Sequence, residues 1–205
     1  MEDVLFKISF PAEFHSQTAV EAAVQLHPLV YDRFDEISKI EGTTHESAIR
    51  ISSKSGPLAN PADRDHCLQY MIAVPLITGD LIAENYENQY HQNDPRIDIL
   101  RDKMQITEDK RYSDDYHDPT KRSIANAIQV FFKDGSSTEK VEIEYPVGHR
   151  RRREEGIPLL EAKFKKNLET RFPSWKCEKI FGICLDQDRL ESTPVKDFMD
   201  LFRIN

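Results

Sequence analysis

A histidine and a tyrosine four residues apart are the side chains in this sequence best suited to acid–base chemistry. His66 and Tyr70 fall within residues 61–79, for which a helix is predicted, so both would lie on one face. Arg64 and Gln69 beside them could bind a carboxylate. The spacing alone favours a buried core histidine and a packing aromatic over a pair that performs general acid–base catalysis.

The most conspicuous charged feature is His149 followed by four arginines at residues 150–153. Such a run is typical of a phosphate or nucleic-acid patch. Because Glu154 and Glu155 follow directly, a solvated helix start or an ion-paired interface is the favoured interpretation.

The cysteines and the remaining histidines give no metal-ligand pattern. The three cysteines lack C-x-x-C spacing, and their separations do not fit iron–sulfur motifs; they are Cys67, Cys177 and Cys184. An odd number of cysteines without such spacing makes a disulfide framework unlikely and indicates a reducing compartment. The other histidines are expected to be structural or surface groups; they are His27, His45, His91 and His117. We therefore predict no metal.

The elements that must position these residues indicate an α+β fold up to about Gly148. Thr18, with Glu21 three residues later, predicts the start of a helix that Pro28 ends. Asn60 as cap and Pro61 as first residue predict the helix of residues 61–79, which Gly79 ends.

The remaining segments complete this prediction. Strand-like patterns cover residues 37–42, 45–52 and 104–107, and short helices are predicted at 82–90 and 94–103. Residues 112–122 are polar and turn-rich, and residues 127–133 and 140–145 predict a hairpin around Asp134 and Gly135. After Gly148 three helices are predicted, at 159–172, 177–185 and 194–202. They would have little to pack on among themselves.

The composition excludes several classes of protein. Hydrophobic residues make up 39% and charged residues 31% of the chain, which is typical of a folded globular protein. The net charge of −8 argues against nucleic-acid binding. The longest apolar run, residues 70–78, is broken by Pro75 and is too short to span a membrane. Residues 1–14 lack the features of a secretory signal, so we do not expect secretion.

Five stretches in order resemble the C-terminal part of the dehydratases of the MmgE/PrpD family. They begin at Phe10 (FPAEFHSQTAVEAA), Gly56 (GPLANPADRDHCLQYM), Asp94 (DPRIDILRDK), Asp118 (DPTKRSIANA) and Tyr145 (YPVGHRRRREEGIPLL). The resemblance runs from about Lys7 nearly to the C-terminus. Several independent long motifs in the right order are far more specific than one short pattern.

The resemblance implies a hydro-lyase that dehydrates 2-methylcitrate to 2-methyl-cis-aconitate, in the methylcitrate cycle of propionate catabolism, without a cofactor. It also implies a homodimer, with the active site between a large helical domain and a small, lid-like α+β domain. Residues 1–148 would be the small domain, and residues 149–205 would return to a helical domain that the N-terminal half builds. The enzyme would lie in the mitochondrial matrix of a eukaryote or the cytoplasm of a bacterium.

The resemblance also assigns site residues. Related decarboxylases place a His and a Tyr of the matching H-x-x-x-Y pattern at the substrate pocket, which favours catalytic roles for His66 and Tyr70. Residues 10–17 line the family's cleft, which makes His15 a third catalytic candidate, with an exposed loop histidine as the alternative. The predicted substrate-binding residues are Lys7, Arg64, Gln69 and Arg150.

Two hypotheses of different classes remain. In the first, the chain is a lyase portion whose active site is completed by an N-terminal helical segment. In the second, it is a catalytically inert, stand-alone domain that acts in dimerisation or partner binding. Activity in the presence and absence of the N-terminal segment would separate them.

Overall fold

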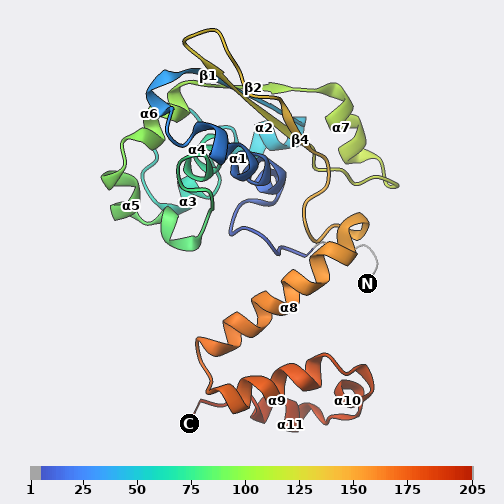
Figure 1. Cartoon of the computed structure of the whole chain (residues 1–205). Coiled ribbons are helices and arrows are strands. Elements are labelled where there is room, and N and C mark those ends of the chain that lie inside the picture. The colour runs from blue at the N-terminus through green and yellow to red at the C-terminus, as the bar shows by residue number, and fades with distance from the viewer. Residues whose placement is uncertain (1–5, 205) are drawn as a thin grey trace. The chain divides into compact units, whose positions relative to one another are not determined.

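The computed structural model describes residues 6–204. Met1 to Leu5, which belong to the segment considered for a targeting signal, and Asn205 lie outside the described residues. The chain divides into two compact units between Arg152 and Arg153. Figure 1 shows the chain coloured from its N-terminus to its C-terminus.

The first unit contains a four-stranded sheet in the order β2-β1-β3-β4. The strands are β1 (Ile37–Thr44), β2 (Met104–Glu108), β3 (Asn126–Phe132) and β4 (Val141–Ile143). β2 runs parallel to β1, whereas β3 runs antiparallel to both β1 and β4. Along β1, buried Ile37 and Ile40 point to the core while Ser38 is exposed, so one face of the sheet is apolar. The expected α+β class is confirmed.

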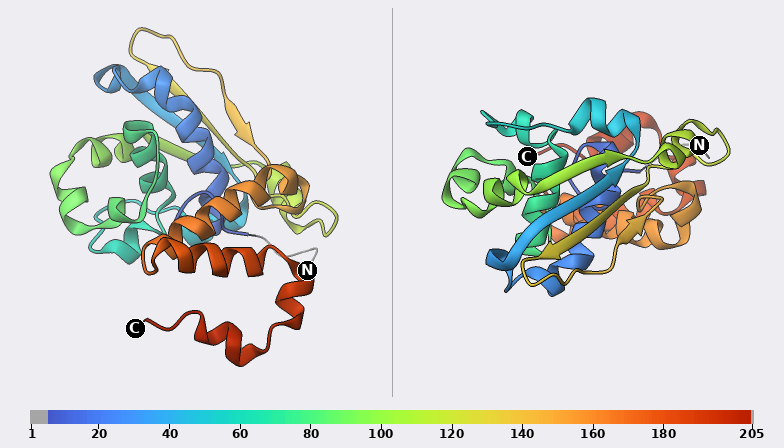
Figure 2. Two further views of the ribbon diagram at one scale, coloured as in Figure 1. Left: turned by 60° about the horizontal axis from the view of Figure 1, so that its bottom comes forward. Right: turned by 90° about the horizontal axis from the view of Figure 1, so that it is seen from above.

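Two helices, α1 (Gln17–Val30) and α4 (Leu68–Thr78), pack on each other and, with the apolar face of the sheet, form the core. The right-hand view of Figure 2 looks down on the strands with these helices behind them. Ala19, Ala22, Ala23 and Leu26 give α1 one apolar face. By contrast, every residue from Leu68 to Ile77 in α4 is buried. A helix that is apolar all round needs covering on all sides.

Shorter helices connect these elements. They are α2 (Glu46–Ser52), α3 (Pro61–Arg64), α5 (Asn88–Asn93), α6 (Arg96–Asp102) and α7 (Lys110–His117). Single 3₁₀ turns accompany them: η1 (Phe14–Ser16), η2 (Phe34–Glu36), η3 (Ala83–Tyr86) and η4 (Arg150–Arg152).

The second unit is helical: α8 (Arg153–Glu169), α9 (Ser174–Cys184), α10 (Gln187–Ser192) and α11 (Val195–Asp200). Its core is small, with Leu168, Cys177 and Ile180 buried against partly buried phenylalanines. Large apolar side chains stay exposed on these helices, including Trp175, at 66% exposure, and Val195. The unit therefore buries only part of its apolar surface within itself.

The boundary between the units lies four residues after the expected break at residue 148. Arg152 explains the difference, because its guanidinium forms an ion pair with Glu21 of α1 at 2.8 Å. The same guanidinium donates to the Tyr145 carbonyl at 2.7 Å. The end of the arginine run is thus tied into the first unit.

Three expectations about secondary structure were wrong. Residues 45–52, expected to be a strand, form α2, whose first backbone N–H, that of Glu46, donates to the Ser113 hydroxyl at 2.9 Å. The turn-rich residues 112–122 instead contain most of α7, which Asp109 caps through the Arg111 N–H. Pro28 does not end α1: its fixed φ is compatible with a helix, so the chain continues to Val30 without the hydrogen bond that an N–H at this position would make.

The start of α1 also differs from its predicted form. The helix begins at Gln17, and Thr18 lies inside the first turn. Its hydroxyl does not cap the helix but donates to the Ile124 carbonyl at 2.6 Å. A buried bond to another segment has therefore replaced the local capping box.

The predicted helix of residues 61–79 is two helices. Asn60 caps α3 as expected, with its side-chain oxygen accepting the Asp63 N–H at 3.0 Å, and Gly79 ends α4 in the left-handed conformation. Between them the chain leaves the helix, and Cys67 adopts an extended conformation. The i to i+4 relation assumed for His66 and Tyr70 is therefore broken, because His66 lies in the gap.

Candidate active site

The segment before α1 places His15 in a fixed position. His15 lies in η1, and the Glu13 carboxylate accepts its backbone N–H at 2.8 Å. The amide of Gln17 donates to the Phe10 carbonyl at 2.8 Å and to the Ala12 carbonyl at 3.0 Å. Because both contacts lie within one short loop, they hold the loop against the first turn of α1.

The His15 ring connects a carboxylate to a tyrosine hydroxyl. Its Nδ1 lies 2.7 Å from Glu13 Oε1, and its Nε2 lies 3.0 Å from the Tyr116 hydroxyl of α7. A carboxylate accepts hydrogen bonds, so Nδ1 carries the proton that is donated to Glu13. Nε2 is then free to accept the Tyr116 O–H. The side chain of His15 is only 15% exposed, so this arrangement is shielded from bulk water.

Glu13 remains ionised in this surrounding. Burial opposes its charge, but hydrogen bonds from His15, the positive charge that His15 can carry and a bond from the Ser52 hydroxyl outweigh burial. The pKa of the Glu13 carboxyl is therefore held below its ordinary value. The Ser52 hydroxyl donates to Oε2 at 3.0 Å. A charged acceptor behind Nδ1 fixes the ring tautomer, as carboxylates do behind catalytic histidines.

A second histidine lies against this pair. The His45 ring stacks on Tyr116, with centroids 4.6 Å apart and planes at 12°, and its centroid is 5.3 Å from that of His15. His45 is fully buried, and neither ring nitrogen has a hydrogen-bond partner in the described part of the chain. Burial lowers the pKa of His45 to about 4; the neighbouring His15 and His117 add to this shift, and Glu13 opposes it. His45 is therefore neutral at physiological pH.

A cavity of about 300 Å³ opens beside these groups. Its lining residues are Phe14, His15, Tyr116, Arg122 and Ile124. The volume is at the lower end of the range for small-molecule sites, and apolar walls with a few convergent polar groups are typical of them. A tyrosine hydroxyl bonded to an imidazole at its edge can transfer a proton to or from a bound ligand.

The structure does not bring the predicted pair His66 and Tyr70 into one patch. His66 has a half-exposed side chain, and its Nδ1 lies 2.6 Å from Asp65. Tyr70 is fully buried, and its hydroxyl donates to the Asn85 carbonyl at 2.5 Å. Burial raises the pKa of the Tyr70 hydroxyl far above its ordinary value.

The predicted substrate-binding residues Arg64 and Gln69 are buried and bonded within the protein. Arg64 donates to the Tyr86 carbonyl at 2.7 Å and to the side chain of Asn88. Gln69 accepts the Lys54 N–H at 3.1 Å and donates to Ser53 at 3.0 Å. In this structure both side chains hold loops in place.

The other two predicted substrate-binding residues lie near the two sequence ends of the first unit. Lys7 is exposed in the segment that precedes η1. Arg150 donates to the Thr120 carbonyl at 2.6 Å and to the Pro119 carbonyl at 3.3 Å. Arg150 is thus connected to the loop that leads to Arg122.

Hydrogen bonds nevertheless link the segment around His15 to the segment around His66 and Gln69. The Glu13 N–H donates to the Asp65 carbonyl at 3.3 Å, directly before His66. Ser52, whose hydroxyl donates to Glu13, precedes Ser53 and Lys54, which both form hydrogen bonds with Gln69. Of the three predicted catalytic residues, only His15 lines the cavity.

Sequence reasoning missed His45 and Tyr116, which complete the cluster around His15. Each lies far from His15 in the sequence, on a different helix or loop, so no local spacing marks them. His45 was expected to be structural or a surface group, and Tyr116 lay in a segment expected to be turn-rich. The one local signal was Glu13, two residues before His15, whose side chain accepts the His15 N–H at the start of η1.

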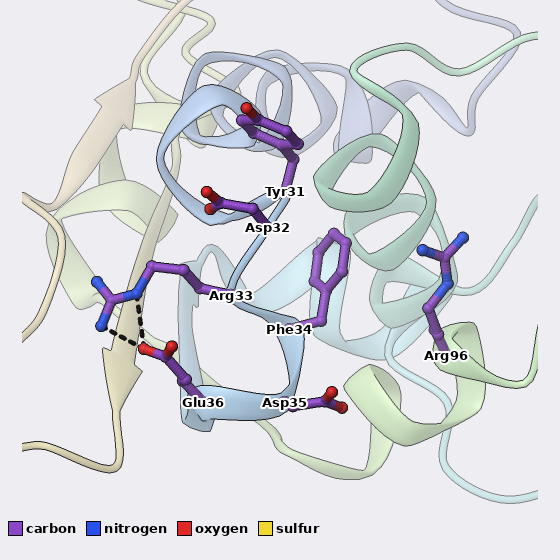
Figure 3. A pocket seen from close by; sticks show the side chains of 7 residues that line it. All are labelled: Tyr31, Asp32, Arg33, Phe34, Asp35, Glu36 and Arg96. Carbon is purple, nitrogen blue, oxygen red and sulfur yellow. Dashed lines mark hydrogen bonds and ion pairs between the residues drawn. The ribbon is translucent and has the colours of Figure 1, made fainter.

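A second hollow, of about 330 Å³, lies at the far end of α1 (Figure 3). It is lined by Tyr31, Asp32, Arg33, Phe34, Asp35, Glu36 and Arg96. Its two cations are already paired: Arg33 with Glu36 at 2.5 Å, and Arg96 with Asp94 at 2.6 Å. These neutralised charges make it a poorer candidate for an anionic ligand than the cavity at His15.

In residues 6–204, no group of three or more His, Cys, Asp or Glu side chains is arranged to hold a metal ion. The three cysteines carry free thiols. None of the described helices combines the length and the apolar character needed to cross a bilayer.

Comparison with known proteins identifies a family. A family model described as the MmgE/PrpD C-terminal domain matches residues 10–187. The whole chain is 54% identical to 2-methylcitrate dehydratase of Escherichia coli K12 and 53% identical to that of Cupriavidus necator, covering 43% of each relative. The mitochondrial 2-methylcitrate dehydratase of Yarrowia lipolytica is 50% identical over 98% of the chain and 39% of its own length. The chain thus spans about two fifths of these relatives.

Proposed function

The chain belongs to the MmgE/PrpD family, and we propose that it is the C-terminal portion of a 2-methylcitrate dehydratase. The proposed reaction removes water from 2-methylcitrate to give 2-methyl-cis-aconitate, a step of propionate catabolism by the methylcitrate cycle. It is supported by 50–54% identity to proteins that carry this name in bacteria and a yeast.

The observation that carries the proposal is the chain of contacts from Glu13 through His15 to Tyr116 at the edge of a cavity. Dehydration breaks a C–H bond and a neighbouring C–O bond while a C=C bond forms. A base must take the carbon-bound proton, and an acid must protonate the leaving hydroxyl so that water departs. We assign one of these two transfers to the His15–Tyr116 pair, with Glu13 stabilising the imidazole in its protonated form.

The remaining site predictions rest on the resemblance and stay proposals. His66 and Tyr70 are proposed catalytic residues, and Lys7, Arg64, Gln69 and Arg150 are proposed substrate-binding residues. The side chains of His66, Tyr70, Arg64, Gln69 and Arg150 bond to other groups of this chain, and Lys7 lies at the surface. A role in catalysis or substrate binding therefore requires further groups from the rest of the enzyme.

The proposed partner is the N-terminal helical half of the same enzyme. The relatives are more than twice as long as this chain. We propose that α8 to α11 complete a helical domain with that half, since exposed apolar side chains such as Trp175 and Val195 require covering. A homodimer, and a mitochondrial matrix location in a eukaryote or a cytoplasmic one in a bacterium, belong to the same proposal.

The test is an activity assay on the 205-residue chain with and without the N-terminal half of a relative. The chain alone should leave 2-methylcitrate unchanged, and the mixture should form the conjugated product, detected by its absorbance. In the active mixture, His15→Gln should lower turnover about a hundredfold or more, because glutamine cannot transfer a proton.

His27→Gln is the matched control, because His27 lies at the other end of α1, bonded to the Leu76 carbonyl. It should stay within a few-fold of the unsubstituted mixture. Full activity from the chain alone would overturn the proposed incompleteness. A mixture without activity would instead favour the alternative, a catalytically inert domain that dimerises or binds a partner.

A further inference from the structure

Arg122 lines the cavity with His15 and Tyr116. Its backbone has a φ of +50°, and it is the only non-glycine residue with a positive φ in the described part of the chain. The left-handed region is costly for a residue with a Cβ, and such residues concentrate where function requires the geometry.

Neighbouring segments impose this conformation. The Arg122 N–H donates to the Asp118 carbonyl at 2.8 Å, and the next N–H, of Ser123, donates to the Asp115 carbonyl at 3.3 Å. Asp118 itself is fixed, because its carboxylate accepts the N–H and hydroxyl of Thr120. A turn bonded at both ends therefore presents Arg122 at the cavity.

The Arg122 side chain differs from the arginines around it. Arg111 pairs with Glu142 at 2.7 Å, and Arg152 pairs with Glu21 at 2.8 Å. Arg151 donates to the Thr120 carbonyl and lies over the Tyr145 ring. Within residues 6–204, the Arg122 guanidinium makes no hydrogen bond or ion pair. It is an available cation at the cavity's rim.

We infer that Arg122 is the carboxylate-binding residue of the His15 cavity, and that the cavity's ligand is a small polycarboxylate. The planar guanidinium can hold a carboxylate through two parallel hydrogen bonds. Tyr116 and His15 would then face the neighbouring carbon atoms, where proton transfer takes place. The inference rests on the proposed function for the ligand's identity, but it names a residue and a contact that the family assignment does not.

Binding to the 205-residue chain tests the inference without turnover. The probe is tricarballylate, a tricarboxylate that lacks the hydroxyl and cannot be dehydrated. Its affinity is measured by calorimetry, and the affected backbone amides are identified by NMR. Saturable binding should shift the amides of residues 14–16 and 116–124. Arg122→Met should weaken it about ten- to a hundredfold, the usual cost of a lost charge-assisted bond.

Two further variants keep the result interpretable. Arg50→Met removes the same charge from an exposed side chain outside this cavity, and it should bind tricarballylate like the unsubstituted chain. Arg122→Gly removes the side chain but relieves the positive φ, so it should weaken binding without lowering the unfolding temperature. A variant that folds normally and loses binding isolates the guanidinium.

Equal affinity of Arg122→Met and the unsubstituted chain would overturn the inference, as would the absence of saturable binding to the unsubstituted chain. Loss of binding equal in Arg50→Met and Arg122→Met would show a general charge effect and would also overturn it. The dehydratase proposal is tested independently. If Arg122→Met loses tricarballylate binding but the unsubstituted chain mixed with the N-terminal half never forms product, the inference stands and the dehydratase proposal falls.

Discussion

At the scale of single residues, burial and hydrogen-bond partners decide which titratable side chains can exchange a proton with a ligand. His66 and Tyr70 share a pattern, but the first is half exposed and the second is fully buried. His15 gains Glu13, Tyr116 and His45 as neighbours. Burial and hydrogen bonding therefore distinguish residues that composition and spacing treat alike.

Tyr70→Phe should lower the free energy of unfolding by about 1 kcal/mol, because the buried hydroxyl donates to the Asn85 carbonyl. His66→Ala should leave stability nearly unchanged, since its partner in the described part of the chain is the partly exposed Asp65. Urea unfolding measures both.

If His66 or Tyr70 does acid–base work, its substitution lowers turnover of the complete enzyme about a hundredfold or more. A few-fold change for both would return them to structural roles.

His45 should make stability depend on pH. Its folded pKa of about 4 lies below the unfolded value of 6.5, so the unfolded chain binds the proton more readily between these values. Stability from the neutral ring is complete above pH 6.5 and is lost as pH falls toward 4. Between pH 7 and pH 5 the loss is about 2 kcal/mol.

Urea unfolding at several pH values measures this effect. His45→Phe keeps a ring against Tyr116 and should flatten the pH dependence, although Glu13 and His149, whose pKa values are also lowered, contribute in the same direction. His66→Gln serves as the control for the loss of a histidine, because it removes a half-exposed side chain and not a buried one. An unchanged slope in His45→Phe would contradict the prediction.

At the scale of elements, local signals located the Asn60 and Gly79 ends of residues 61–79 but misplaced both ends of α1 and the identity of residues 45–52. The Asn60 cap and the Gly79 stop were confirmed, because both act through backbone geometry within a few residues. The expected strand at residues 45–52 is a helix, since its contacts with α7 and η1 decide its form.

Gly79→Ala tests the end of α4 against Gly135→Ala, a substitution at a similar positive φ. At Gly135 an added Cβ meets nothing within 4 Å, so only the backbone conformation costs energy, about 1 kcal/mol. At Gly79 the Cβ would lie 2.9 Å from His27 Cδ2, a ring that the Leu76 carbonyl holds. Gly79→Ala should therefore lose about 1 kcal/mol more. Equal unfolding midpoints for the two variants would contradict this steric account.

At the scale of the whole molecule, the two units differ in how much apolar surface each one buries. The first unit has a continuous core from α1, α4 and the sheet, whereas the second buries only a few large side chains. Opening free energies follow such differences in buried contacts.

Hydrogen exchange should therefore show lower protection in α9 to α11 than in α4 and β3. Adding the N-terminal half should raise protection in those C-terminal helices if they complete its helical domain, while the protection of β3 stays constant. Protection of α9 in the isolated chain equal to that of α4 would contradict the expected difference. No change on adding the other half would count against the proposed packing.

The sequence by itself determined the α+β class, most element positions, the family and His15 as a candidate. These depend on local periodicity, on capping chemistry and on long motifs that survive in order. Only the tertiary structure decided that Tyr116 and Arg122 meet His15 at one cavity and that His45 packs against His15 and Tyr116, while Tyr70 and Arg64 are buried by protein contacts. The physical reason is distance along the chain: contacts between α7, η1 and the loop before β3 depend on sheet pairing and core packing, which no local pattern encodes.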